Sequence, residues 1–460
     1  MATTDSWLTF FKFQTWLRAA AFVIGLNFLF IAIMLLASMI PAENMRERAA
    51  RAFDSGSLST QDYRRFDSSI GWHQYNDCLI LQMISNDDSM LSQSLGPLVY
   101  YPEDFRGFCG AFRALLEHEL TTDELYSFRY TRYWHGHNAV TAALLLGLDF
   151  ATVRQILRAA SYLSLLVLAL VALRNGPHLR AMGLIIALFG AVFWGLPYFA
   201  QSPSHGPGDT AVVLGLVILF ALAQRGVSIS SYQVLCAGFG ATLVFMEFLT
   251  GLLPTAAALL LPFGYLAARS AEPSVGYVAA RWRFALAGLV AFGLGVVLTA
   301  LLKQLLALAV FGPEVIEAFT NNLNYYVQDP ERGPDNRFLM GLYTAMAMIL
   351  KWGTILAYGS GTGTRILFGS AIAAWGAAFL IALRLWSKHS AHLLVVCAAG
   401  AAIILIWILV LPTHTFVHPY MVRMMIAPIA LGWIALALQL LEFARQRNNS
   451  RRAAPAEGPR

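Results

Sequence analysis

Long uninterrupted runs of apolar residues dominate this chain, and polar residues gather in a few segments between them. A helix of about 20 apolar residues is long enough to cross the roughly 30 Å hydrocarbon layer of a bilayer. Runs of this kind lie at residues 19–40, 155–173, 181–199, 210–224, 230–248, 249–267, 284–305, 366–385, 392–411 and 424–442. The pattern predicts an all-α polytopic membrane protein with about ten transmembrane helices.

The longest polar segment, residues 41–138, lies between the first two apolar runs. It holds 14 of the chain's 26 acidic residues but only 9 of its 32 basic ones. Cytoplasmic loops are enriched in Lys and Arg, so this segment belongs on the outer side of the membrane. Residues 44–53 and 103–120 have the composition of amphipathic helices. We therefore expect residues 41–138, called the cap below, to form a small α-rich periplasmic unit.

Basic residues in the remaining loops fix the number of crossings. The short loops on the side opposite the cap carry Arg174, Arg180, Arg225, Arg269, Arg281, Arg283, Arg384 and Lys388. The tail, residues 443–460, is basic as well, so an even number of crossings is expected. Residues 338–357 are apolar enough for an eleventh span, but counting them would send the tail outside. We expect that segment to be a re-entrant or membrane-surface helix.

The sequence thus divides into four parts. It predicts a cytoplasmic N-terminus with an uncleaved signal-anchor helix (1–40), the cap (41–138), a multi-span domain (139–442) with outer loops at 200–209, 312–337 and 412–423, and a cytoplasmic tail (443–460).

Composition supports this assignment. Hydrophobic residues make up 58% of the chain and charged residues 13%, which excludes an ordinary soluble protein. The net charge of +6 is explained by topology, so the lipid bilayer and not nucleic acid is the expected partner. The four cysteines show no Cys-x-x-Cys spacing for zinc. Cys78 and Cys109 both lie in the cap, where an oxidising compartment would allow a disulfide, but spacing alone does not set its geometry.

The first candidate for chemistry is Asp77, which lies within the segment 71–88. A carboxylate on the outer side could take a proton from an acceptor hydroxyl or bind a cation. Asp87 and Asp88 follow nearby, and a polar loop can also contain aspartates without any special role.

The second candidate is the segment 128–140, where Arg132 and His135 flank Tyr133 and Trp134. Aromatic and basic residues anchor proteins at the bilayer surface. Arg and His beside aromatic rings also suit a phosphate and the face of a sugar. The sequence leaves both interpretations open.

The third candidate is the outer turn 411–423, with His414, His418 and Arg423. Two histidines four residues apart can bind metal on a helix. Pro412 and Pro419 interrupt a helix here and no third ligand is near, so the pattern favours gripping a phosphate over binding a metal. Two further charges, on Glu247 and Lys303, fall within apolar runs, where ionisable residues are either functional or reach out to the interface.

Four motifs in this order resemble the GT-C superfamily of membrane glycosyltransferases, and more narrowly a bacterial group of this type. They are YNDCLIL (75–81), YTRYWHG (130–136), MEFLTGLLP (246–254) and HTFVHPYMVR (414–423). YTRYWHG is the most specific of them, and the resemblance runs along most of the chain in the same order. Many GT-C enzymes have paired acidic residues where this chain has Asn76 and Asp77, and the related group has Asp in place of Glu247. Dependence on a divalent cation is therefore left open.

The resemblance implies transfer of a sugar from a polyprenyl-phosphate donor to a periplasmic glycan, lipid or protein acceptor at the bacterial inner membrane, with inversion at the anomeric carbon. It implies Asp77 as the catalytic base; Arg132, His135, His414, His418 and Arg423 as the donor-phosphate site; and Tyr133, Trp134 and Glu247 as contacts to acceptor or sugar. Arg132 and Arg423 would then hold the same phosphate.

The rival interpretation is a transporter or lipid flippase, with Lys303 and Glu247 lining a pathway. Transporters commonly show repeated halves, and no such repeat is apparent in this sequence. A scaffold protein, the third class, would not need the clusters of His and Arg.

Overall fold

Helices form nearly all of the computed structural model, which describes residues 13–64, 66–102, 107–246, 251–268, 277–327 and 336–453. The first helix and the cap comprise α2 (Phe13–Ala37), α3 (Ala42–Asp54), α4 (Gln74–Ser85), α5 (Met90–Leu95), β1 (Leu98–Tyr101), α6 (Phe108–Leu116), η1 (Thr122–Glu124), β2 (Tyr126–Arg129) and the start of α7 (Gly136–Gly147). The remaining elements are α8 (Phe150–Leu173), α9 (Pro177–Phe193), α10 (Leu196–Phe199), α11 (Gly206–Arg225), α12 (Ile229–Met246), α13 (Leu252–Ala267), α14 (Tyr277–Phe311), α15 (Glu314–Val327), α16 (Arg337–Leu350), η2 (Gly353–Ile355), α17 (Gly361–Leu385), α18 (Lys388–Val410), α19 (Pro412–Val417), η3 (Pro419–Met425) and α20 (Ile426–Ala453).

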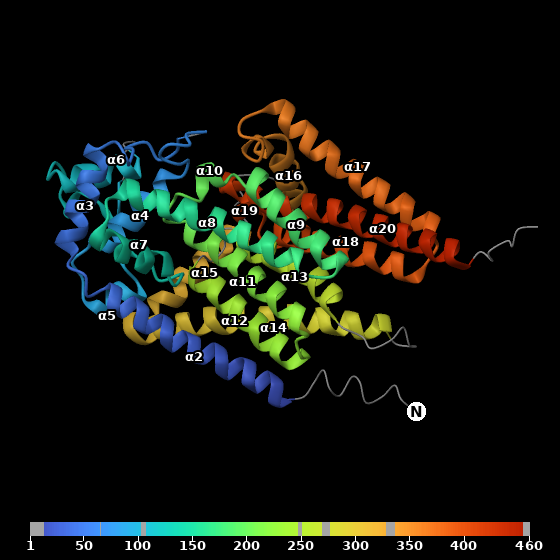
Figure 1. Cartoon of the computed structure of the whole chain (residues 1–460). Helices are drawn as coiled ribbons and strands as arrows, with labels where there is room; N and C mark the ends of the chain where they lie inside the picture. Colours follow the sequence, from blue (N-terminus) through green and yellow to red (C-terminus); the bar gives the residue numbers. More distant parts are fainter. Residues whose placement is uncertain are drawn as a thin grey trace, which may run out of the picture.

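The long helices confirm an all-α polytopic membrane protein. Within the described residues, nine helices are long and apolar enough to cross a membrane, and α9 and α13 are shorter apolar helices. Large apolar side chains on their outer surfaces are exposed, such as Phe28 at 69% and Ile372 at 73%. This outward-facing apolar surface suits contact with lipid chains. In Figure 1, α2 begins and α20 ends at the end of the bundle opposite α3, α4 and α6, as an even number of crossings requires.

The ambiguous segment 338–357 contains α16 and η2. The stretch Phe338–Ile355 is one of the nine helical stretches that are long and apolar enough to cross a membrane. The α-helical part has 14 residues, about 21 Å at 1.5 Å per residue, which is short of the hydrocarbon thickness. The preceding span ends at Phe311, under the guanidinium of Arg129 in the cap. The next span begins after Gly359, which lies against the ring of Phe66 in the cap. The chain between these two spans therefore starts and finishes on the cap side.

The cap has its own hydrophobic core, built mainly from α3, α4 and α6. A disulfide joins Cys78 of α4 to Cys109 of α6, with 5.4 Å between their Cα atoms, so the pairing that the sequence allowed is present. The expected helix at 44–53 is α3, and the one expected at 103–120 is α6, which is shorter. Strands β1 and β2 pair antiparallel, with Leu98 opposite Arg129. This two-stranded sheet was not predicted from the sequence, because each strand has only four residues.

Candidate active site

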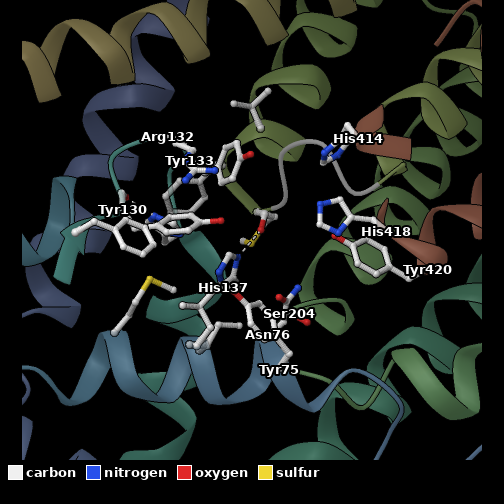
Figure 2. Close-up of a pocket in the computed structure, with 18 of the residues that line it drawn as sticks. Tyr75, Asn76, Tyr130, Arg132, Tyr133, His137, Ser204, His414, His418 and Tyr420 are labelled. Carbon is white, nitrogen blue, oxygen red and sulfur yellow. Dashed lines mark hydrogen bonds between the residues drawn. The ribbon is translucent and has the colours of Figure 1, made fainter. Parts of the chain in front are cut away.

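A cavity of about 290 Å³, called the junction pocket below, lies where the cap meets the membrane helices. Its lining comes from segments far apart in sequence: Tyr75, Asn76, Leu79, Ile80, Met83, Tyr101, Phe128, Tyr130, Arg132, Tyr133, His135, His137, Ser204, Val244, Phe245, Met246, Tyr326, His414, His418 and Tyr420. In Figure 2, His414 and His418 face Arg132 and Tyr133 across the pocket. Five of the predicted site residues, all from the two motifs YTRYWHG and HTFVHPYMVR, therefore line one pocket: Arg132, Tyr133, His135, His414 and His418.

The YTRYWHG segment reaches the pocket through a tight backbone turn. His135 has a left-handed backbone, with φ of +43°, and it caps the start of α7. The imidazole of His135 lies 2.9 Å from the carbonyl oxygen of Tyr130, which closes the turn. A Cβ on Gly136 would lie 2.6 Å from the ring of Phe245, so this close approach of α7 to α12 requires glycine. The turn places Arg132, Tyr133 and His135 in the pocket lining.

Trp134 faces away from the pocket. Its side chain is fully buried, and its indole Nε1 donates to the carbonyl oxygen of Thr299 at 3.3 Å. The ammonium of Lys303 lies 5.7 Å from the Trp134 ring and donates to the carbonyl oxygens of Leu95 and Thr131. The structure therefore places Trp134 in the core instead of the predicted sugar site, and Lys303 binds the backbone of the cap.

Tyr326, from helix α15, links the two halves of the site. Its hydroxyl accepts a hydrogen bond from Arg132 Nη1 at 3.1 Å and lies 3.2 Å from the hydroxyl of Tyr133. Its ring packs edge to face on His414, with centroids 4.4 Å apart, and His414 packs in turn on His418 at 4.6 Å. The sequence analysis did not single out Tyr326, although it placed the segment 312–337 on the same face of the membrane.

The electrostatic character of the pocket comes from one guanidinium and several imidazoles. Arg132 is positively charged at any physiological pH. Burial lowers the pKa of His137 to about 4, and burial also holds the pKa of His135 well below its usual value. Both rings are therefore neutral near pH 7, so they act as hydrogen-bonding groups. Nδ1 of His137 lies 2.9 Å from the carbonyl oxygen of Met246.

Asp77 lies behind the wall of the pocket, while its neighbour Asn76 lines the cavity. The Asp77 carboxylate is fully buried and accepts a hydrogen bond from Arg154 Nη2 at 2.9 Å. The hydroxyl of Ser202 donates to its other oxygen, and the oxygens of Ser202 and Ser204 are 2.7 Å apart. Since Ser204 lines the pocket, two hydroxyl groups connect the cavity to the carboxylate. Burial raises the pKa of Asp77 to about 6.

Arg423 is held in a separate buried ion pair. Its Nη2 lies 2.5 Å from an oxygen of Asp209, and its Nε donates to the carbonyl oxygen of Trp194 at 3.0 Å. Arg423 is only 4% exposed and does not line the junction pocket. The structure therefore does not place Arg423 beside Arg132, where the sequence analysis expected a shared phosphate. Glu247 lies outside the described residues.

No family model, curated protein or solved structure matches this chain.

Proposed function

We propose that this protein is a membrane glycosyltransferase that moves a sugar from a polyprenyl-phosphate donor to a periplasmic glycan, lipid or protein acceptor. The observation that carries the proposal is the convergence of Arg132, His135, His414 and His418 on one pocket between the cap and the apolar helices. A lipid-linked donor keeps its tail in the bilayer and its phosphosugar at the surface, so its site has to lie at such a junction. Disulfides persist in oxidising compartments, so the cap disulfide supports a periplasmic location at the bacterial inner membrane.

The lining suits a sugar phosphate. A cavity of about 290 Å³ is close to the lower end, roughly 300 Å³, of ordinary small-molecule sites. Arg132 would bind the phosphate as a charge-assisted donor, and the imidazoles of His414 and His418 would hydrogen-bond its remaining oxygens. The tyrosine rings would pack against the apolar face of the sugar. The described residues of the lining include no carboxylate, so in this proposal Arg132 and not a divalent cation offsets the charge of the leaving phosphate.

Asp77 would act as the base through the two serine hydroxyls. The acceptor hydroxyl would give its proton to Ser204 as its oxygen attacks the anomeric carbon. Ser204 would pass a proton to Ser202, and Ser202 would pass one to Asp77. The bond between the anomeric carbon and the phosphate oxygen breaks, polyprenyl phosphate leaves, and attack from the opposite face inverts the anomeric centre. The buried Arg154 would hold the carboxylate in place.

The transporter alternative is less well supported. A transporter would use Lys303 to line its substrate pathway. Lys303 is only 1% exposed, however, and its ammonium donates hydrogen bonds to two backbone carbonyl oxygens. Its described contacts serve to attach α14 to the cap.

Turnover on defined donors tests the proposal. The purified full chain in nanodiscs would be incubated with a panel of polyprenyl-phosphate sugars, and polyprenyl phosphate and transferred sugar would be followed by mass spectrometry. We expect one donor class to be consumed, with loss of turnover in Arg132→Gln and normal turnover in Arg113→Gln, a substitution at an exposed cap ion pair. If the chain in proteoliposomes moved the intact donor from one leaflet to the other without cleaving the bond between sugar and phosphate, the result would support a flippase instead.

A further inference from the structure

Three metal-ligating side chains meet at the end of the bundle away from the cap. His178 is the second residue of α9, His389 is the second residue of α18, and Glu442 lies in α20. Nε2 of His178 lies 3.0 Å from Oε1 of Glu442, and Nε2 of His389 lies 3.5 Å from the same oxygen. The three atoms all lie within 4.8 Å of one another. None of these residues belongs to the junction pocket.

We propose that His178, His389 and Glu442 bind a divalent transition-metal ion, with zinc as the preferred ion. Two imidazoles and one carboxylate are an established zinc ligand set, and water commonly takes the fourth position. Zinc bonds of about 2.0–2.2 Å in a tetrahedral site place neighbouring ligand atoms roughly 3.3–3.6 Å apart. The two distances to Glu442, 3.0 and 3.5 Å, are close to that separation, and all three ligand atoms lie within 4.8 Å of one another, so side-chain rotations would bring them onto one ion. This inference does not depend on the glycosyltransferase proposal.

The surrounding packing holds the ligands in place before any ion binds. Ser390, next to His389, donates its hydroxyl to the side-chain oxygen of Gln439, and Gln439 Nε2 donates back to the Ser390 carbonyl at 2.8 Å. This reciprocal pair fixes α18 against α20 about one turn from Glu442. A site whose ligands are positioned in advance pays little ordering entropy on binding.

The burial of Glu442 also points to a cation. Its side chain is only 5% exposed, and a buried carboxylate is costly unless a positive charge compensates it. Arg445 is 3.7 Å away, but its side chain is 64% exposed, so it can turn outward towards lipid headgroups. A bound divalent ion would supply a compensating charge that both imidazoles already face.

The competing explanation is a metal-free network in which each imidazole donates its Nε2 hydrogen to Glu442. Metal binding by the untagged full chain in detergent distinguishes the two. We expect one zinc ion per chain after gel filtration, a zinc-dependent rise in melting temperature, and visible d–d absorption when cobalt(II) replaces zinc. The cobalt spectrum of the unaltered protein gives an answer even if the variants fold poorly.

Variants that each remove one ligand provide a second test. Loss of an outer-shell partner typically weakens metal binding about 10- to 100-fold, so His389→Gln and Glu442→Gln, which remove ligands, should lose at least that much affinity. The control is His392→Gln on the same helix, whose Nδ1 accepts a hydrogen bond from the Trp282 indole at 3.3 Å and which is not one of the three clustered ligand side chains. It should retain zinc. Zinc binding that is absent in the unaltered protein, or equal in the unaltered protein and Glu442→Gln, would overturn the proposal in favour of the metal-free network.

Discussion

Arg132 and Tyr326 are 194 residues apart in sequence, yet Arg132 Nη1 donates to the Tyr326 hydroxyl at 3.1 Å. This bond joins the loop after β2 to helix α15, and both residues line the junction pocket. The hydroxyl of Tyr133 lies against the same phenol. Tyr326 therefore orients the one guanidinium that the proposal assigns to the donor phosphate.

Replacing Tyr326 by Phe should weaken donor recognition. The variant keeps the ring contact with His414 but removes the acceptor of Arg132, and a hydrogen bond to a charged group contributes about 1.5–3 kcal/mol. We expect kcat/KM for the donor to fall by roughly 10- to 100-fold with little change in melting temperature. Tyr126→Phe, at an exposed position of β2, is the matched control. Equal kinetics for the two variants would remove Tyr326 from the site.

The two arginines of the outer motifs should differ in what their loss affects. Arg132→Lys should reduce donor affinity with the fold intact, since Lys does not reproduce the planar geometry of Arg. Arg423→Gln should instead lower stability, by about 3–5 kcal/mol, because it leaves the buried Asp209 without its partner. Donor binding and chemical denaturation of both single variants and the double variant provide the measurement. Independent sites predict additive effects, whereas less than additive losses of donor binding would show that both arginines act on one ligand.

Proton transfer from the acceptor through Ser204 and Ser202 to Asp77, called the serine relay below, predicts that changes along this path lower turnover. Asp77→Asn should lower kcat by about 10²–10⁴, the usual contribution of a general base. Ser204→Ala should lower kcat as well, because it interrupts the path to the carboxylate. Asp87→Asn, at an exposed position in the same part of the cap, should have little effect. A Ser204→Ala variant with normal kcat would rule out the relay.

The same relay predicts a pH dependence. Burial raises the pKa of Asp77 to about 6, so the carboxylate is the main form at pH 7 and is lost as the pH falls through about 6. The kcat of the unaltered protein should therefore decrease on the acidic side with a midpoint near pH 6. A pH profile of single-turnover rates measures it, and a flat profile between pH 5 and 7 would argue against Asp77 as the base.

Gly136 should be essential for packing. A Cβ there would overlap the ring and the carbonyl oxygen of Phe245, at 2.6 and 2.7 Å, so Gly136→Ala should destabilise the protein by about 1–3 kcal/mol and disturb the pocket. Gly147, at the other end of α7, has nothing within 4 Å of the corresponding position. Gly147→Ala should be neutral or slightly stabilising. Thermal unfolding of the two variants compares them directly.

The sequence predicts the fold well because its main signal is local. Each transmembrane helix is a continuous apolar run, and the amphipathic segment 44–53 reappears as α3. The pocket could be predicted only in part. YTRYWHG and the late histidines are recognisable motifs, but the bonds from Arg132 to Tyr326, Asp77 to Arg154 and Arg423 to Asp209 join residues 77 to 214 positions apart. Such pairings follow from helix packing, which no local pattern encodes. The sequence analysis therefore expects Trp134 and Arg423 in the pocket, whereas contacts with distant residues hold both of them outside it.

Cleavage of the donor by the unaltered chain, compared with cleavage by one pocket variant, tests the central claim most directly. The measurement is the amount of polyprenyl phosphate released per sugar transferred, for the unaltered chain and for Arg132→Gln at equal folded concentration. The account predicts equal amounts of the two products from the unaltered chain, an inverted anomeric linkage, and a loss of both products in the variant. Undiminished release by Arg132→Gln, or no release from any polyprenyl-phosphate sugar by the folded unaltered chain, would contradict it.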